Sequence, residues 1–281
     1  MSSSHDVFVP DGTEPAAALA RTTDLGIGAH PDDLELDLLP AIAHCVDDPE
    51  RWFTGVVCTD GAGAVRGGRF AGLADAELGV VRRTEQEAAA QLGRYGAMVQ
   101  LGHPSATVRS DAGHAALVDE LAELVAATSP AHVYTHNLAD KHETHVAVAA
   151  AVVLAVRSLP AEQRPWRLIG CEGWRDLDWL PDGEKVVLDV SAHAALGDQL
   201  ASVFASQLEG AKRYDLAAAG RRRANATFQA PRAPDEASQV VVAMDLGPLV
   251  HNVDIDPVRY VTAAIDRFRD EVERELRRWW P

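Results

Sequence analysis

The chain has 281 residues, of which 47% are hydrophobic, and a formal net charge of −16 at pH 7. This length and apolar content suit one large or two small domains with a sizeable core. An acidic surface repels phosphate backbones and anionic lipids, so neither nucleic acid nor a membrane surface is expected as a partner.

Cysteine usage and the N-terminal sequence bear on the compartment. Cys45, Cys58 and Cys171 are far apart and form no C-x-x-C pair, which is typical of buried thiols in a reducing compartment. The first residues, MSSSHDVFVPDG, show no signal peptide, and the apolar run at 146–156 is too short to span a bilayer. We expect a soluble, cytoplasmic protein; the sequence leaves its oligomeric state open, including a homo-oligomer.

The first half of the chain begins with a polar, proline-containing segment at 1–22, which predicts a loosely held arm. Short apolar runs then predict strands at 25–29, 53–59, 97–101 and 131–136. Longer runs between them predict helices at about 34–47, 75–93, 113–127 and 143–158. Because strands that alternate with helices form a parallel sheet covered on both faces, ligands are expected beyond the carboxyl ends of the strands.

The second half, from about residue 160, has a looser pattern. Its apolar runs predict strands at 166–172, 185–190 and 239–246, and helices are predicted at 192–218 and 256–279. The polar stretch 220–238 is predicted to be a long loop from its composition. We expect three parts: the arm at 1–22, a core at 23–160, and a C-terminal part at 161–281 that completes the sheet and walls a substrate pocket.

The first predicted strand breaks off into a polar sequence, GIGAHPDDLEL at 26–36. His30 stands at the carboxyl end of that strand, and Asp33 follows three residues later. A histidine and two carboxylates are costly beside a buried strand unless they hold something. The alternative is that Asp32 or Asp33 only caps the next helix, with His30 incidental.

A second polar sequence, THNLADKHETH at 135–145, also follows a strand end. His142 and His145 are three residues apart where a helix begins, so they face the same way. A catalytic zinc takes three protein ligands and keeps an open position for water. His30, Asp33 and His145 could supply that set.

Two residues of these motifs are left outside the ligand set. Asp32 would lie beside the metal without completing its ligands, as the general base for a metal-activated water must. His142 is suited to polarise a carbonyl or to protonate a leaving group.

The chain resembles the LmbE/PIG-L family of zinc-dependent N-acetylglucosaminyl deacetylases. The matching sequences are AHPDD (29–33), TDGAG (59–63), RRTEQEAAAQLG (82–93) and HETH (142–145), and the resemblance spans about residues 23–160. It implies a Rossmann-like α/β fold, a three-layer sandwich with a mostly parallel sheet and an irregular C-terminal extension. It also implies a hydrolase that removes an acetyl group from the nitrogen of an amino sugar or related metabolite, or an amidase that acts on a thiol conjugate.

The resemblance assigns roles at matching positions. It implies zinc ligands at His30, Asp33 and His145, a general base at Asp32, and assistance to the carbonyl oxygen from His142. Asp32 would take a proton from the attacking water, and a protonated His142 would stabilise the oxyanion before acetate and free amine form. Zn²⁺ is the expected metal, although Fe²⁺ or Co²⁺ could occupy the same ligands.

The sequence departs from the family pattern in two places. The second motif is usually H-x-D-H, whereas Thr144 stands at the acidic position here, so the residue that orients His142 could be Glu143 or Asp140. Ser105 stands where an acid often binds sugar. A catalytically weak zinc protein used for binding or assembly is therefore an alternative. A nucleotide-binding Rossmann protein is a further one, motivated by GIG at 26–28, but Pro31 stands where the third glycine belongs.

The expected substrate contacts are Arg82, Trp174 and Arg175. Arg82 matches a family arginine that contacts substrate, although it could instead pair with Glu85. The tryptophan-rich 174–179 and the basic 212–223 are both candidates to border the metal pocket and set substrate choice, with Trp174 as the first candidate. The basic stretch could equally be a solvated loop, an anion clamp or a subunit contact. The other histidines, including His44 and His132, are expected to be structural, and His136 is a candidate to support the site.

Overall fold

The computed structural model describes residues 6–210, 212–228 and 232–280. In this part of the chain, eight strands form one sheet in the order β1-β4-β3-β2-β5-β6-β8-β7. Their bounds are Asp6–Phe8 (β1), Asp24–Gly28 (β2), Phe53–Thr59 (β3), Ala97–His103 (β4), His132–His136 (β5), Arg167–Cys171 (β6), Lys185–Asp189 (β7) and Val240–Asp245 (β8). The predicted strands are therefore all present.

The centre of the sheet is parallel. Strands β4, β3, β2, β5 and β6 pair in parallel, whereas β1 and β8 join the two edges of this block antiparallel, and β7 is antiparallel to β8. The central strands β2 and β3 are buried along their whole length, as expected for strands covered on both faces.

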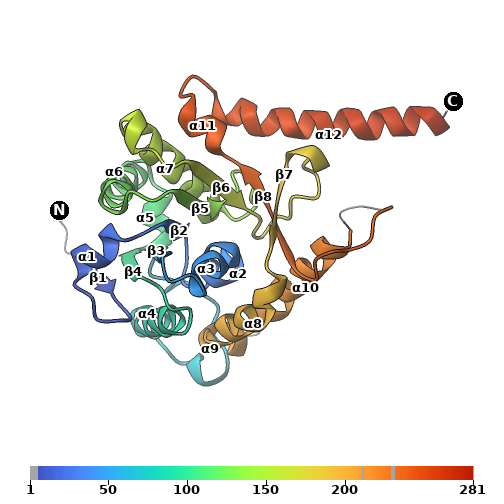
Figure 1. The fold of residues 1–281 in the computed structure, drawn as a ribbon. Helices are drawn as coiled ribbons and strands as arrows, with labels where there is room; N and C mark the ends of the chain where they lie inside the picture. Colours follow the sequence, from blue (N-terminus) through green and yellow to red (C-terminus); the bar gives the residue numbers. More distant parts are fainter. Residues whose placement is uncertain (1–5, 211, 229–231, 281) are drawn as a thin grey trace.

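Helices cover both faces of the sheet (Figure 1). One core contains residues from α1 (Pro15–Ala20), α6 (Asp111–Thr128), α7 (Glu143–Ser158) and α11 (Gly247–His251). The opposite core contains residues from α2 (Asp33–Leu36), α3 (Leu39–Val46), α4 (Asp75–Leu92) and α8 (Ala194–Ser202). The remaining α-helices are α5 (Ser105–Val108), α9 (Ala205–Glu209), α10 (Tyr214–Thr227) and α12 (Pro257–Trp279). This confirms the predicted three-layer α/β sandwich with a mostly parallel sheet.

A glycine in β2 lets the second core close on the sheet. A Cβ added at Gly26 would lie 2.6 Å from the ring of Phe53. Only a residue without a side chain leaves room for that ring, which packs edge-on against Tyr95 with centroids 4.6 Å apart.

Four segments differ from the expectation, the simplest being the predicted helix 192–218, which is divided among α8, α9 and the start of α10. Residues 1–5 of the predicted arm lie outside the described part, but residues 6–22 are held: β1 pairs with β4, and Leu19 of α1 is buried. The predicted helix 34–47 is split into α2 and α3, because Pro40 follows the break and cannot continue the hydrogen-bond ladder of α2.

The last difference concerns the predicted loop 220–238, whose residues 229–231 lie outside the described part. Its first half belongs to α10, and only 232–238 is a described loop. The buried residues Ala219, Arg222 and Ala226 recur at helical spacing, and Arg222 donates from Nε to Gln239 at 3.1 Å. Composition misleads here because arginine and alanine favour helices, and the buried guanidinium has a tertiary partner.

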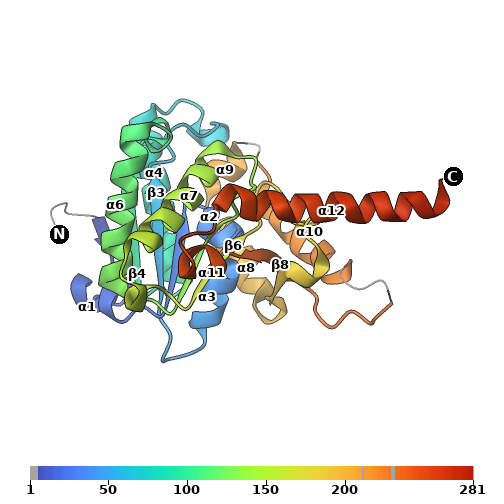
Figure 2. The ribbon, with the colours of Figure 1, turned by 90° about the horizontal axis from the view of Figure 1, so that it is seen from above.

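The last helix, α12, packs on the rest of the fold only through its first turns, and the remainder extends away from the body of the molecule (Figures 1 and 2). Among the helices of the described residues, none has the length and apolar character needed to cross a membrane.

Candidate metal centre and active site

The three predicted metal ligands meet beyond the carboxyl ends of β2 and β5. His30 follows β2, Asp33 begins α2, and His145 lies in the first turn of α7. The Nδ1 atom of His30 lies 3.2 Å from Oδ2 of Asp33. The Nε2 atom of His145 lies 3.3 Å from Nδ1 of His30 and 3.4 Å from Oδ2 of Asp33. Three electron-pair donors thus form a nearly equilateral triangle.

This triangle has the dimensions of a divalent-metal site. Zinc bonds to nitrogen and carboxylate oxygen are about 2.0–2.2 Å, so ligands at the corners of a tetrahedron around zinc stand roughly 3.3–3.5 Å apart. The observed separations of 3.2–3.4 Å fit that spacing. The donor set of two imidazoles and one carboxylate suits zinc, iron and cobalt alike.

A buried carboxylate orients the imidazole ring of His145. Its Nδ1 lies 3.0 Å from Oδ2 of Asp140, so a proton on Nδ1 leaves Nε2 free toward His30 and Asp33. Burial lowers the pKa of His145, but Asp33 and Asp140 together raise it to about 10. The site thus stabilises a positive charge at this position.

Asp140 is itself fixed by backbone donors. It accepts hydrogen bonds from the N–H groups of Lys141 at 2.6 Å, Arg175 at 2.9 Å and Trp174 at 3.2 Å. Burial raises the pKa of Asp140, but its contact with His145 outweighs this and the pKa is lowered. Asp140 therefore stays ionised and links the ligand His145 to the loop after β6.

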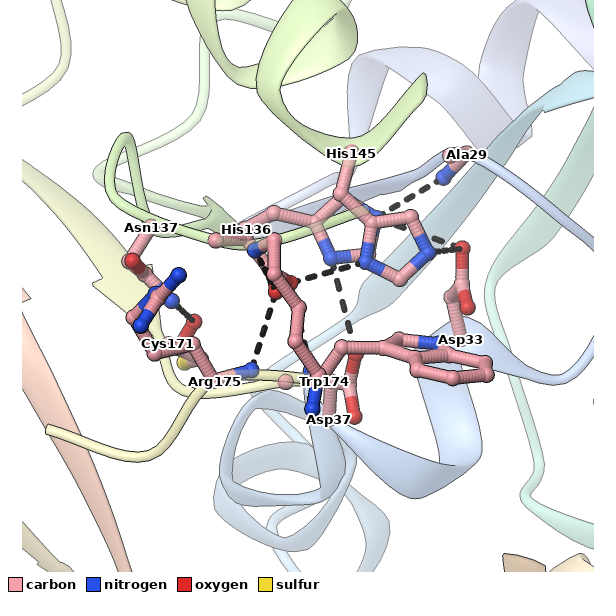
Figure 3. A network of polar contacts seen from close by, with 12 residues as sticks. Ala29, Asp33, Asp37, His136, Asn137, His145, Cys171, Trp174 and Arg175 are labelled. Carbon is pink, nitrogen blue, oxygen red and sulfur yellow. Dashed lines mark hydrogen bonds and ion pairs between the residues drawn. The ribbon is translucent and has the colours of Figure 1, made fainter. Parts of the chain in front are cut away.

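His136, at the end of β5, packs flat against His145 (Figure 3). The two rings stack with centroids 3.8 Å apart, and Nε2 of His136 lies 3.2 Å from Oδ2 of Asp33. That nitrogen also accepts the N–H of Ala29 at 3.0 Å, so its lone pair is engaged. His136 therefore supports the ligand His145 by stacking, and His30 is the better third ligand.

Asp32 lies in a strained turn beside the triangle. Its backbone φ is 98°, in the left-handed region that few non-glycine residues adopt. Its N–H donates to Gln86 at 3.1 Å, and Oδ2 lies 3.1 Å from Nη2 of Arg82. Burial raises the pKa of Asp32 well above its usual value, although Arg82 opposes the shift. A buried carboxyl with a raised pKa suits a general base.

A buried network holds this turn in place. Gln86 donates to Oε1 of Glu35 at 2.7 Å, and the hydroxyl of Tyr95 donates to the same oxygen at 2.6 Å. Burial raises the pKa of Glu35 to about 7, despite these two hydrogen bonds. Because Gln86 contacts both Asp32 and Glu35, α4 fixes the position of the turn.

His142 lies among aromatic rings instead of beside an acid. Its ring centroid lies 4.5 Å from that of His145, 4.8 Å from that of His30 and 5.5 Å from that of Trp174. Its Nδ1 is buried without a hydrogen-bond partner among the described residues. Burial, with the charges of His145 and His30, lowers the pKa of His142 to about 4. We therefore expect a neutral imidazole at pH 7, in place of the protonated one predicted from the sequence.

Neither predicted partner of His142 reaches it. Asp140 contacts His145, as described above. Glu143 lies at the open rim of the cavity, with its side chain 79% exposed and 2.6 Å from Nη1 of Arg109. His142 is thus positioned by the neighbouring rings.

Arg82 is committed to the protein rather than to Glu85. Besides Asp32, it donates to the carbonyl oxygens of Pro31 and, at 3.3 Å, of Gly61. Gly61 has a φ of +61°, and a Cβ there would lie 2.7 Å from Nη1 of Arg82, so both conformation and contact require glycine. Glu85 instead accepts from the hydroxyl and N–H of Ser206.

The triangle opens into a cavity of about 910 Å³. Its wall combines the β2 and β5 motifs with the C-terminal part of the chain. The lining residues include His30, Asp32, Asp33, Arg82, His142, Glu172, Trp174, Lys212 and Tyr214. This volume is at the upper end of what small-molecule sites occupy.

Both C-terminal candidate stretches line this cavity. Trp174 is 39% exposed, and its ring lies 5.8 Å from that of Tyr214. The ammonium group of Lys212 lies 5.7 Å from the ring of Trp174 and 5.9 Å from that of Tyr214. An aromatic surface with a neighbouring cation therefore faces the cavity.

Arg175 does not line the cavity, contrary to expectation. Its Nε donates to the carbonyl oxygen of Ala139 at 2.8 Å, and its N–H holds Asp140. Arg175 braces the loop that carries Asp140, because its side chain turns away from the cavity. The sequence could not distinguish it from its neighbour Trp174, since only the tertiary contact with Ala139 decides its direction.

A second histidine–aspartate group lies at the opposite end of the sheet. Nδ1 of His44 and Nδ1 of His132 lie 2.9 and 3.1 Å from Oδ1 of Asp24. The guanidinium of Arg51 lies 3.4 Å from both Asp24 and His44. The Arg51 guanidinium already places a positive charge beside Asp24 and His44. The triangle of His30, Asp33 and His145, at the carboxyl ends of β2 and β5, is therefore the better metal site.

Comparison with known families gives one match. Residues 25–156 match the family described as "PIG-L: GlcNAc-PI de-N-acetylase". Among curated protein sequences, none matches the chain significantly.

Several solved structures share the fold. N,N'-diacetylchitobiose deacetylase from Pyrococcus horikoshii is 17% identical, with 83% of this chain and 86% of that chain covered and a TM-score of 0.60. The zinc-inhibited form of teicoplanin deacetylase Orf2 is 18% identical, with 80% and 97% covered and a TM-score of 0.57. GalB, the 4-carboxy-2-hydroxymuconate hydratase from Pseudomonas putida KT2440, is 16% identical, with 80% and 96% covered and a TM-score of 0.61.

Proposed function

We propose, from the premise that residues 25–156 form a PIG-L family domain, that this protein is a metal-dependent N-deacetylase. The family match and the deacetylases among the structural neighbours support a deacetylase. The observation that carries the metal dependence is the triangle of His30, Asp33 and His145, whose spacing fits a divalent ion.

In this proposal, His30, Asp33 and His145 hold the ion, and Asp140 orients His145. A bound divalent ion would supply Lewis acidity and an acidified water. Zinc is the first candidate, and iron or cobalt fits the same donors. Because one structural neighbour is described in a zinc-inhibited form, the activating metal of this protein has to be measured.

Asp32 takes the proton from the attacking water. Its strained turn, held by Gln86 and by Arg82, places the carboxylate at the edge of the ligand triangle. The raised pKa of this carboxyl makes it a stronger base than an exposed aspartate. Arg82 thereby acts as a positioning residue for Asp32.

His142 assists on the opposite side of the reacting carbonyl. As a neutral imidazole, it can donate one N–H hydrogen bond to the amide oxygen as negative charge develops there. Its unpartnered Nδ1 and its place in the cavity wall support this role. The proton that Asp32 has taken from the water then passes to the leaving nitrogen as the carbon–nitrogen bond breaks, so the products are acetate and a free amine.

The substrate we propose is an N-acetylated amino sugar or a related small metabolite. Sugar rings stack on aromatic faces, and Trp174 with Tyr214 offers such a surface 5.5 Å from the ring of His142. The cavity of about 910 Å³ exceeds what a single acetylated sugar fills, which favours a disaccharide or a sugar conjugate. A thiol conjugate with an amide bond is a second substrate class for the same chemistry. The cytoplasmic location stays a prediction.

The test is acetate release from a defined panel. Purified protein with its metal content measured is incubated with N-acetylglucosamine, N,N'-diacetylchitobiose, N-acetylglucosaminyl conjugates and N-acylated thiol conjugates. We expect acetate and free amine in equal amounts from at least one acetylated sugar. Stoichiometric metal without acetate release from any member would favour the binding or assembly alternative. Hydration of an unsaturated acid by the same preparation would favour chemistry like that of the hydratase neighbour.

A further inference from the structure

The C-terminal helix α12 carries an apolar surface that the rest of the chain leaves uncovered. It runs from Pro257 to Trp279, and residues 265–280 are all exposed. Figures 1 and 2 show this part extending past the body of the molecule in two perpendicular views. Leu276, Trp279 and Trp280 are 54%, 80% and 77% exposed.

The apolar residues of α12 lie on one side of the helix. They recur at intervals of three or four residues, the spacing that places side chains along one stripe. The stripe consists of Val258, Val261, Ile265, Phe268, Val272, Leu276 and Trp279. Only Val261 and its neighbour Ala264 are buried against the body. A stripe made for packing therefore continues for several turns with nothing packed on it.

The base of the helix is firmly attached. Asp256 caps its first turn, and Arg267 makes two 2.6 Å hydrogen bonds to Glu184 in the loop before β7. The exposed part is thus the continuation of an anchored helix. About 15 residues of isolated helix are only marginally stable in water, so a packing partner would be needed to keep this part folded.

The exposed area is sufficient for a stable dimer. With aromatic side chains of ~150–250 Å² each, the stripe beyond residue 264, together with Trp280, exposes on the order of 600 Å². A pair of such helices would remove roughly 1,200 Å² from water, the lower bound of standard protein–protein interfaces. A monomer rarely leaves a connected apolar patch of this size exposed.

The charges of α12 favour a second copy over a membrane. The helix carries six arginines and five acidic residues, interspersed along its polar side. A helix that lies on anionic lipid has a polar side rich in lysine and arginine, and the −16 charge of the chain opposes such lipid further. Two nearly neutral helices can approach each other without that penalty. The exposed part of α12 is roughly 22 Å long at 1.5 Å per residue. This length exceeds the Debye length of ~8 Å, so salt screens the repulsion between the two acidic bodies when the helices pair.

We propose that residues 265–280 of α12 pair with the same segment of a second copy of this chain. The pair is a two-fold symmetric coiled coil in which Phe268, Val272 and Leu276 form the centre and the tryptophans cover the end. The interface lies away from the cavity, so it requires nothing of the proposed deacetylase activity.

Sedimentation velocity of the full chain tests this directly. Between about 1 and 100 μM we expect a concentration-dependent rise toward twice the 30.1 kDa mass of one chain. The Phe268→Glu/Leu276→Glu double variant should stay monomeric over that range and lose helical circular dichroism. Arg274→Glu lowers the net charge by the same two units on the polar side, so this control should still dimerise.

Three results would overturn the proposal. One is a wild-type chain that sediments as a monomer at every concentration. Another is a double variant that dimerises as well as Arg274→Glu, since the interface would then lie elsewhere. The third is a monomeric chain that cosediments with phosphatidylcholine/phosphatidylglycerol vesicles through Phe268 and Leu276, which would assign the stripe to lipid. Unchanged thermal unfolding of the body in both variants shows that neither effect comes from misfolding.

Discussion

Replacing Asp140 with asparagine should weaken metal binding while leaving the chemical step nearly intact. Asp140 neither contacts the proposed base Asp32 nor lines the cavity itself, but its Oδ2 lies 3.0 Å from Nδ1 of His145. Carboxylates that support a metal-bound histidine typically contribute 10–100-fold in affinity, which is about 1.4–2.7 kcal/mol. Asparagine keeps the shape and one acceptor for the backbone N–H groups, so the loss should come mainly from the missing charge.

The assay separates affinity from turnover. Metal-free wild type and Asp140→Asn are titrated with zinc in a competing chelator, and acetate release is then measured with the metal in excess. The dissociation constant should rise 10–100-fold, whereas kcat at saturating metal should fall less than about 3-fold. Glu143→Gln makes the same chemical change on an exposed carboxylate two residues from His145 and should alter neither quantity. Equal zinc affinity in wild type and Asp140→Asn would refute the assignment of Asp140, and with it the orientation of His145.

Three further substitutions test other parts of the site. Asp32→Asn should retain metal but lower kcat by about 10²–10⁴-fold, and parallel loss of metal would instead make Asp32 a ligand. Trp174→Ala should raise KM or lower kcat/KM with metal content unchanged; unaltered kinetics on a confirmed substrate would pass substrate selection to the loops at 60–68 and 103–111. Burial raises the pKa of Glu172 from 4.5 to about 7, so the unfolded carboxyl ionises first and stability falls as pH rises between those values. Urea unfolding gives the free energy of unfolding of wild type and Glu172→Gln at pH 4 and at pH 8. Between these two pH values, the stability of Glu172→Gln relative to wild type should increase by roughly 3 kcal/mol. The same pH dependence in both proteins would contradict a buried, protonated carboxyl at Glu172.

The sequence alone predicts the metal-site motifs, because the residues of each motif lie close together in the chain. His30 and Asp33 are three residues apart, as are His142 and His145, and both pairs follow short apolar runs that predict buried strands. The parallel sheet then brings the two strand ends to one edge, so the meeting of these residues follows from fold class alone.

The rest depends on contacts between distant segments. Arg82 is only three residues from Glu85 in sequence, yet it reaches back to Asp32 because α4 crosses the turn after β2. Arg175 and Trp174 are neighbours whose side chains turn in opposite directions, toward Ala139 and toward the cavity. The group of Asp24, His44 and His132 is assembled from three elements and has no sequence spacing to reveal it.

Helix α12 shows the same division between local and distant information. Its stripe predicts a helix from 256 to 279, close to the observed bounds. Hydrophobic periodicity cannot show whether the apolar stripe of a helix packs on the core of the same chain or remains exposed, because that depends on the tertiary structure around the helix. The arginine-rich part of α10 differs from the predicted loop for a related reason, because the buried partner of Arg222 lies 17 residues further along the chain.

A metal titration of the metal-free protein, followed by acetate release, tests the central claim most directly. We expect no activity without metal and a linear rise that ends at one equivalent per chain. His145→Ala should abolish both the rise and the binding, while His136→Ala, which removes a stacked neighbour, should retain one weakened site. Full acetate release from thoroughly chelated protein, or one tightly bound equivalent in the His145→Ala variant, would contradict the account of a metal held by His30, Asp33 and His145.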